Sequence, residues 1–147
     1  MTRTNPTLFL DTSVIFAAIL SPGGGARRLF QLGEWGLMRL LVGPRVLQEC
    51  ETIVRRKAPQ SLPLVALLLD TAKVQQSPAA DDASLQKAFG LVSYRPDAYV
   101  LAEALTASAD WFVTHDKAHL LKILPEESLP IRIGTPGDVL QALAQEF

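Results

Sequence analysis

An aspartate interrupts one of the most apolar stretches of the sequence, LFLDTSVIFAAIL (residues 8–20). Removing a lone carboxylate from water costs on the order of several kcal/mol. The residues before Asp11 form a short predicted strand that is apolar on both faces, so they offer the carboxylate no surface. Asp11 therefore needs a compensating group, and a bound cation would serve.

Three further carboxylates fall where a parallel sheet would bring them to the same edge. Glu49 lies in the first turns of a predicted helix, and Asp97 begins another. Asp116 follows the predicted strand WFVT (111–114) by two residues. Open parallel sheets bind ligands at the carboxyl ends of their strands, where the chain order reverses. We therefore expect Asp11, Glu49, Asp97 and Asp116 to converge there.

Four carboxylates at one place imply metal chemistry. Like charges a few ångströms apart repel one another and raise each other's pKa. A hard divalent cation relieves this repulsion, and Mg²⁺ or Mn²⁺ takes oxygen ligands while keeping several waters. Such an ion can hold a phosphodiester, activate a water and stabilise the leaving oxygen. These residue types thus indicate a metal-dependent nuclease.

Ordinary structural roles compete with this interpretation at several positions. A helix N-cap role is about as well supported for Asp97 as a ligand role. Glu49 lies beside Glu51 and fits an exposed helix residue, and the pair Asp81-Asp82 competes with Asp97 for the third acidic position. Asp11 has the weakest ordinary explanation because of its apolar neighbours.

The elements that must position these residues alternate between strand and helix. Strands are expected at 7–11, 37–42, 111–114 and 131–133, and helices at 12–20, 26–36, 44–57, 62–74, 97–108 and 135–147. Residues 77–90 fit either a loop or a short helix, and 115–124 a loop leading into a short helix. This order predicts an α/β fold, a three-layer α/β/α sandwich with a mostly parallel central sheet. We expect one domain over residues 1–147.

Composition agrees with a globular protein of the cytoplasm. The chain has 147 residues, 48% of them hydrophobic and 20% charged, and one cysteine, Cys50, which cannot form an internal disulfide. Residues 8–20 are too short and too interrupted for a membrane span or signal peptide. The basic clusters Arg27-Arg28 and Arg55–Lys57 fit either helix-end stabilisation or phosphate contact, and both interpretations stay open.

Four segments in order resemble the PIN-domain ribonucleases, in particular the toxins of bacterial toxin–antitoxin pairs. The segments are LFLDTSVIFAAI, VLQECETIVRR, PDAYVLAEAL and DWFVTHDKAHLL, followed by IRIGTPGDVL near the end. The resemblance implies an endoribonuclease that hydrolyses RNA with Mg²⁺ or Mn²⁺. It further implies an antitoxin partner, and we expect a homodimer.

The resemblance also assigns roles to single residues. It implies that Asp11, Glu49, Asp97 and Asp116 are the catalytic and metal-binding residues. Ser13 and Thr114 match hydroxyl positions that order metal-bound waters or phosphate. The chain departs from the family at His115, where a glycine often follows the threonine.

The same residues are compatible with other functions. A non-catalytic RNA-binding or scaffold module of the same fold is the main alternative. A phosphatase using Asp11 as nucleophile would need a lysine or second acid at a familiar spacing, which the sequence lacks. His115 and His119 lack the glutamate of a zinc-protease helix and are interpreted as surface or capping residues. The segment SPGGGARRL lacks the ending of a P-loop and does not follow a strand.

Overall fold

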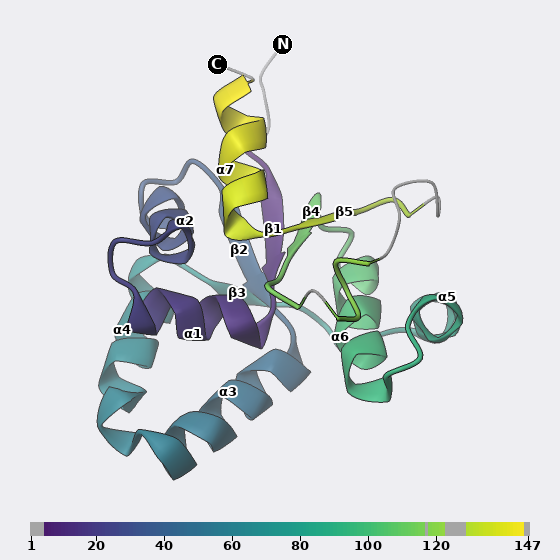
Figure 1. Ribbon diagram of the computed structural model, residues 1–147, viewed down its shortest axis with the longest axis horizontal. Helices are drawn as coiled ribbons and strands as arrows, with labels where there is room; N and C mark the ends of the chain where they lie inside the picture. The colour runs from purple at the N-terminus through teal and green to yellow at the C-terminus, as the bar shows by residue number, and fades with distance from the viewer. Residues whose placement is uncertain (1–4, 117, 123–128, 146–147) are drawn as a thin grey trace.

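The computed structural model describes residues 5–116, 118–122 and 129–145, and its centre is a five-stranded sheet (Figure 1). In chain order the strands are β1 (Thr7–Leu10), β2 (Arg39–Val42), β3 (Gln75–Gln76), β4 (Trp111–Val113) and β5 (Arg132–Gly134). They are arranged β3-β2-β1-β4-β5, and each neighbouring pair is parallel. The predicted α/β class is confirmed, with parallel pairing throughout the described sheet.

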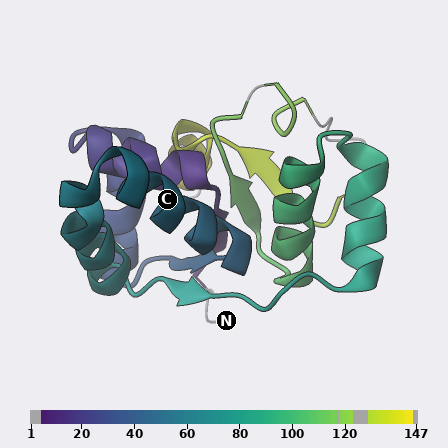
Figure 2. The same ribbon diagram turned by 90° about the horizontal axis from the view of Figure 1, so that it is seen from below.

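Helices cover both faces of this sheet. They are α1 (Thr12–Leu20), α2 (Gly25–Glu34), α3 (Pro44–Lys57), α4 (Leu62–Thr71), α5 (Asp82–Leu91), α6 (Arg95–Thr106) and α7 (Pro136–Gln145), with a 3₁₀ turn at Pro59–Ser61. The chain moves outward in one direction from β1 to β3 and then returns to β4, so right-handed crossovers place α1–α4 and the α5–α6 pair on opposite faces. Figure 2 shows these two groups on either side of the strands. Helix α7 packs on α2, which completes the first layer.

The inner strands are held by apolar packing on both faces. Leu8, Phe9 and Leu10 of β1 are fully buried. The Phe9 and Phe112 rings of β1 and β4 pack edge to face, with centroids 5.6 Å apart. This packing fixes the two neighbouring strands from whose ends Asp11 and Asp116 extend.

Helix α3 begins where the backbone passes very close to the core. Gly43 precedes it, and a Cβ atom there would lie 2.8 Å from Cδ of Glu103 and 2.9 Å from Cζ of Phe9. Val46, Cys50 and Val54 then face inward, as their spacing predicts, so Glu49 is left exposed. Because α3 contacts both α1 and α6, it reaches across the carboxyl edge of the sheet.

The most apolar helices serve as core elements. Helix α1 buries Val14, Ile15 and Ala18, and α4 buries Val65 and Leu68. Among the residues that the structure describes, no helix has the length and apolar character needed to cross a membrane.

Several element boundaries differ from those expected. Helix α6 begins at Arg95, so Asp97 lies in its first turn and makes no N-cap hydrogen bond. The ambiguous segment 77–90 contains most of α5, whose N-cap is Asp81: its carboxylate accepts the Ser84 amide hydrogen at 2.8 Å. Residues 118–122 form turns, whereas 117 and 123–124 of the expected loop and short helix lie outside the described residues.

Candidate metal centre at the carboxyl edge of the sheet

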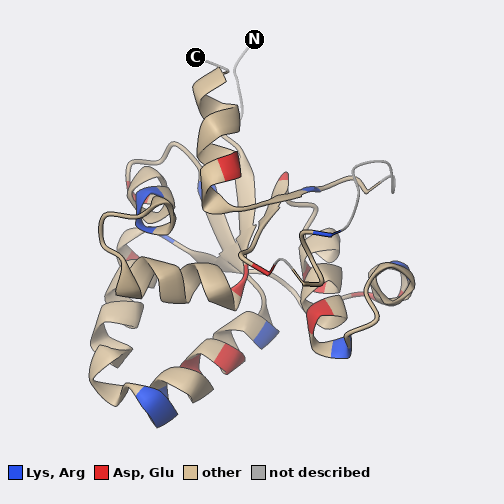
Figure 3. Ribbon diagram, viewed as in Figure 1, with Lys and Arg blue, Asp and Glu red and all other residues tan. Residues whose placement is uncertain are grey.

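The order of the strands reverses between β1 and β4, and the candidate residues lie at this point. Asp11 follows β1 directly, and its amide donates to the Val113 carbonyl at the end of β4, 3.0 Å away. Acidic segments from the start of α1, from α3, from the first turn of α6 and from the loop after β4 gather around this edge (Figure 3). The geometry therefore brings the four predicted carboxylates to one region.

Asp11 is anchored by two hydroxyl groups. Thr114 Oγ1 donates to Asp11 Oδ2 at 2.7 Å, and Ser13 Oγ donates to the same oxygen at 3.1 Å. Burial raises the pKa of Asp11 above its usual value; these hydrogen bonds oppose the shift, and repulsion from Asp116 adds to it. Both hydroxyls bond to Oδ2, so neither occupies the second carboxylate oxygen.

Asp116 is placed by a tight turn after β4. Its amide donates to Thr114 Oγ1 at 3.0 Å, so one hydroxyl links both aspartates. Asp116 Oδ1 accepts the amide hydrogens of Ala118 and His119 at 3.0 and 3.1 Å, an Asx-type turn. Burial alone would raise the pKa of Asp116, but its hydrogen bonds with Asp97 and His119 lower it overall.

Asp97, Asp116 and His119 form the tightest cluster of potential metal ligands. One ligand atom from each lies within 4.8 Å of the others. His119 Nδ1 is 2.9 Å from Asp97 Oδ2 and 3.4 Å from Asp116 Oδ2. Burial, the hydrogen bond to Asp116 and the charges of Asp116 and Asp11 raise the pKa of Asp97 to about 7, with His119 opposing. The carboxylates of Asp97 and Asp116 thus interact strongly with each other, and the charge of Asp116 disfavours ionisation of Asp97.

Glu49 faces the same region from α3. Although Glu49 is largely exposed, partial loss of solvation and repulsion by Asp11 raise its pKa. The nearby Thr12 hydroxyl opposes this rise in the Glu49 pKa. Thr12 Oγ1 is buried, and it has no hydrogen-bond partner among the described residues. Beside Glu49 lies a cavity of about 300 Å³ between α3 and α6, lined by Arg45, Gln48, Glu49, Thr52, Ile53, Pro96 and Val100.

These observations fit a hard divalent cation. The carboxylate oxygens of Asp97 and Asp116 are donors that suit Mg²⁺ or Mn²⁺, and the His119 imidazole lies beside them. The raised pKa values of Asp11, Glu49 and Asp97 show that the carboxylates repel one another or lose solvation. The orphaned Thr12 hydroxyl is a group that a metal-bound water would satisfy.

The sequence did not reveal the part that His119 plays. It was interpreted as a surface or capping residue, but its ring contacts two predicted ligands. His119 follows Asp116 by three residues, and a turn over this spacing brings His119 back toward the Asp116 carboxylate. This spacing was the one available signal in the sequence. In the basic cluster on α3, Arg55, Arg56 and Lys57 occupy the last turn of the helix, and Arg55 pairs with Glu51 at 2.9 Å.

The parallel sheet with acidic residues at its carboxyl edge is an arrangement shared with a known protein family. The PIN domain family model matches residues 7–118, so the chain belongs to the PIN domain family. The matched range contains all four predicted carboxylates. PIN domains are generally nucleases, which are hydrolases.

A solved structure shares this fold. It is described as "Crystal structure of VapBC2 from Rickettsia felis bound to a DNA fragment from their promoter". The match has a TM-score of 0.61 at 16% identity and covers 86% of this chain and 96% of that chain. At this identity the likeness establishes the fold alone. Comparison with curated protein sequences gives no significant match.

Proposed function

We propose that this protein is a Mg²⁺- or Mn²⁺-dependent endoribonuclease that hydrolyses RNA phosphodiesters. The observation that supports this most is the convergence of Asp97, Asp116 and His119 within 4.8 Å beside the anchored Asp11. Family membership supports the nuclease class, and the polar, oxygen-rich cluster supports the metal. We also propose that residues 1–147 act as a single domain of this kind.

Each residue has a distinct task in this proposal. Asp11, Asp97 and Asp116 would hold the ion, which when bound neutralises phosphate charge and activates a water. Thr114 fixes Asp11 and the Asp116 backbone relative to each other through its hydroxyl. Glu49 lies on the exposed side of α3, where it would complete the coordination shell or orient the attacking water.

We further propose that the protein is a toxin neutralised by an antitoxin, acting in the cytoplasm as a homodimer. The resemblance of its four acidic segments to PIN-domain toxins supports this, as does a fold shared with a chain of the VapBC2 complex. An antitoxin would cover or invade the acidic edge. Expression of the protein alone should arrest growth, and co-expression with an antitoxin encoded by a short neighbouring reading frame should restore it; a neighbourhood without such a frame would contradict the toxin role.

Cleavage of RNA tests the enzymatic part of the proposal. Purified protein should cut a labelled RNA in Mg²⁺ or Mn²⁺ and stop when EDTA is added. Asp11→Asn keeps the shape and the hydroxyl contacts but removes the charge, so we expect a folded protein with no cleavage. Asp70→Asn, on the exposed surface of α4, is the matched control and should cut normally. An active Asp11→Asn protein, with circular dichroism matching the wild type, would refute the assignment.

A further inference from the structure

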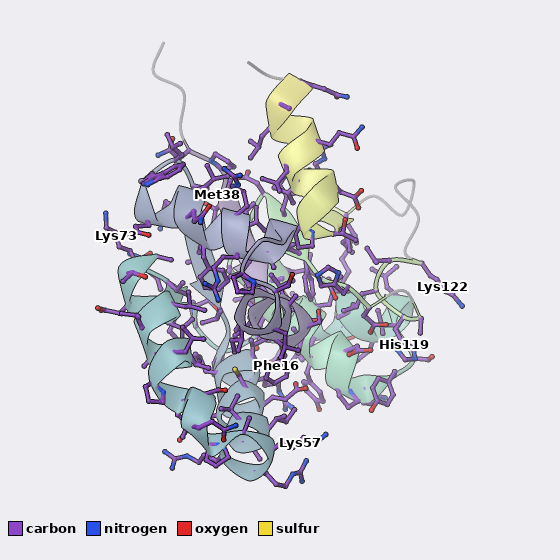
Figure 4. The ribbon with its side chains drawn as sticks, turned by 60° about the vertical axis from the view of Figure 1, so that its left-hand side comes forward. Phe16, Met38, Lys57, Lys73, His119 and Lys122 are labelled. Atoms are coloured by element: carbon purple, nitrogen blue, oxygen red, sulfur yellow. The ribbon has the colours of Figure 1, made fainter. Side chains whose placement is uncertain are left out.

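An aromatic ring reaches solvent directly beside the candidate metal ligands. Tyr94 immediately precedes α6 and is 51% exposed, yet its ring is stacked on His119 with centroids 4.9 Å apart and planes 20° from parallel. His119 is in turn held by Asp97 at 2.9 Å, and it lies beside the α5–α6 pair in Figure 4. The orientation of the Tyr94 ring is therefore tied to the metal centre.

Within the described residues, the stack on His119 uses one face of the Tyr94 ring, and helix capping does not explain the exposed part. Tyr94 occupies the N-cap position of α6 but makes no side-chain capping hydrogen bond. A large aromatic surface left in water forgoes the free energy that burial would supply. The ring is thus free to take a further flat partner.

Two arginines, of the kind that bind a nucleic-acid backbone, lie on α6 and α3, the helices that carry Asp97 and Glu49. The guanidinium of Arg95 lies over Phe89 at 4.0 Å, and that of Arg45 lies over Tyr99 at 3.9 Å. Both arginines are exposed, and Arg45 lines the cavity beside Glu49. Stacked aromatic rings next to exposed, oriented arginines are the combination that binds single strands.

We propose that Tyr94, supported by His119, is a stacking platform for one unpaired base next to the scissile phosphate. The inference rests on the proposed function, since it assigns a base-binding residue to the same site. Bases in a duplex are already paired and stacked, so they present no free face to Tyr94.

Abasic scanning tests this inference without cleavage. A short labelled single-stranded RNA is titrated with protein in Ca²⁺ in place of Mg²⁺, and a gel verifies that the RNA stays intact. Versions of the RNA that lack one base at a time are compared. For the wild type we expect one position at which loss of the base weakens binding roughly tenfold, the range of a single base–aromatic stack.

Variants at Tyr94 show whether that base stacks there. Tyr94→Ala should weaken binding of the intact RNA about as much and should abolish the sensitivity to the abasic position, whereas Tyr94→Phe should preserve both. Trp35→Ala is the matched control, since Trp35 is 62% exposed and precedes β2 at the opposite edge of the sheet. An unchanged abasic profile in Tyr94→Ala overturns the proposal. Wild-type protein that binds duplex RNA as tightly as single-stranded RNA, or that binds no RNA, also overturns it.

The two proposals fail differently. Protein that shows the Tyr94-dependent profile but cuts no RNA in Mg²⁺ refutes the nuclease and leaves the stacking site. Protein that cuts RNA in Mg²⁺ with a flat abasic profile refutes the stacking site alone.

Discussion

Thr114 connects the two strands of the candidate centre through one hydroxyl group. Its Oγ1 donates to the Asp11 carboxylate and accepts the Asp116 amide hydrogen, at 2.7 and 3.0 Å. The side chain is fully buried, so water cannot replace either bond. The relative position of the two aspartates therefore depends on a residue that need not touch a metal.

Thr114→Val should distinguish the role of this hydroxyl in positioning the two aspartates from its role in folding. We expect a folded protein destabilised by about 1–3 kcal/mol, because the Asp11 carboxylate loses its shortest hydrogen bond. Mn²⁺ affinity should fall by roughly 10- to 100-fold, the usual effect of losing a group that orients a metal ligand. Urea unfolding and metal titration measure the two effects. Thr114→Ser keeps the hydroxyl and should bind Mn²⁺ within about threefold of the wild type; equal losses in both variants would contradict the account.

Residue chemistry was predictable in part. Asp11 is conspicuous in the sequence because its apolar neighbours leave it no ordinary role. The contact between His119 and Asp97 was not predictable, because it depends on the turn that Asp116 makes with its own downstream amides. Tyr94 was also missed, since nothing in its local pattern shows that it stacks on a residue 25 positions later.

Helix α3 carries Glu49 to the centre, and its starting point is set by a close approach of the backbone to the core. Gly43 leaves no room for a side chain between Phe9 and the buried Glu103. Glu103 Oε1 also accepts the Arg45 amide hydrogen at 3.4 Å, which helps satisfy the start of the helix. The direction of α3 thus follows from contacts at its first turn.

Gly43→Ala should disturb this helix entry. The added methyl group forces Phe9 or Glu103 to move, and we expect a loss of about 1–3 kcal/mol in the free energy of unfolding. Denaturant unfolding measures the loss. In a Glu103→Ala background part of the space is vacated, so the same substitution should cost less. Equal costs in both backgrounds would show that Glu103 does not restrict this position.

Most elements were predictable because their apolar spacing is regular. The spacing of Val46, Leu47, Cys50, Ile53 and Val54 predicts helix α3 at its observed bounds, Pro44–Lys57. Strand β3 was not predicted, because it consists of only two residues, Gln75 and Gln76, and both are polar and exposed. The predicted start of α6, at residue 97, is two residues later than the observed start at Arg95. The capping preference of Asp97 competes there with the preference of Pro96 for the first turn of a helix.

At the scale of the whole molecule, the acidic edge makes stability depend on pH. A carboxyl whose pKa is higher in the folded state binds its proton more tightly there than in the unfolded chain. Stability therefore falls as pH rises from the unfolded to the folded pKa. For Asp97 this window runs from its usual value of 3.8 to about 7, and the shifts of Asp11 and Glu49 act in the same direction.

Asp97→Asn should flatten this dependence in metal-free protein. At pH 8 we expect the variant to be more stable than the wild type by about 1–2 kcal/mol, since solvent screens part of the repulsion. At pH 4 the advantage should vanish, because wild-type Asp97 is then largely protonated. Thermal unfolding across pH 4–8 in EDTA measures this, with Asp70→Asn as control. If the stabilities of Asp97→Asn and wild type changed in parallel with pH, the raised pKa assigned to Asp97 would be contradicted.

Binding of Mn²⁺, measured by calorimetric titration at pH 7.5, tests the central claim most directly. The account predicts saturable binding by the wild type and by Asp70→Asn, and loss of that binding in Asp11→Asn and Asp97→Asn. It also predicts that saturating Mn²⁺ raises the melting temperature of the wild type but not that of Asp11→Asn or Asp97→Asn. No binding by the wild type, or equal binding by Asp97→Asn, would contradict a metal centre at this edge of the sheet.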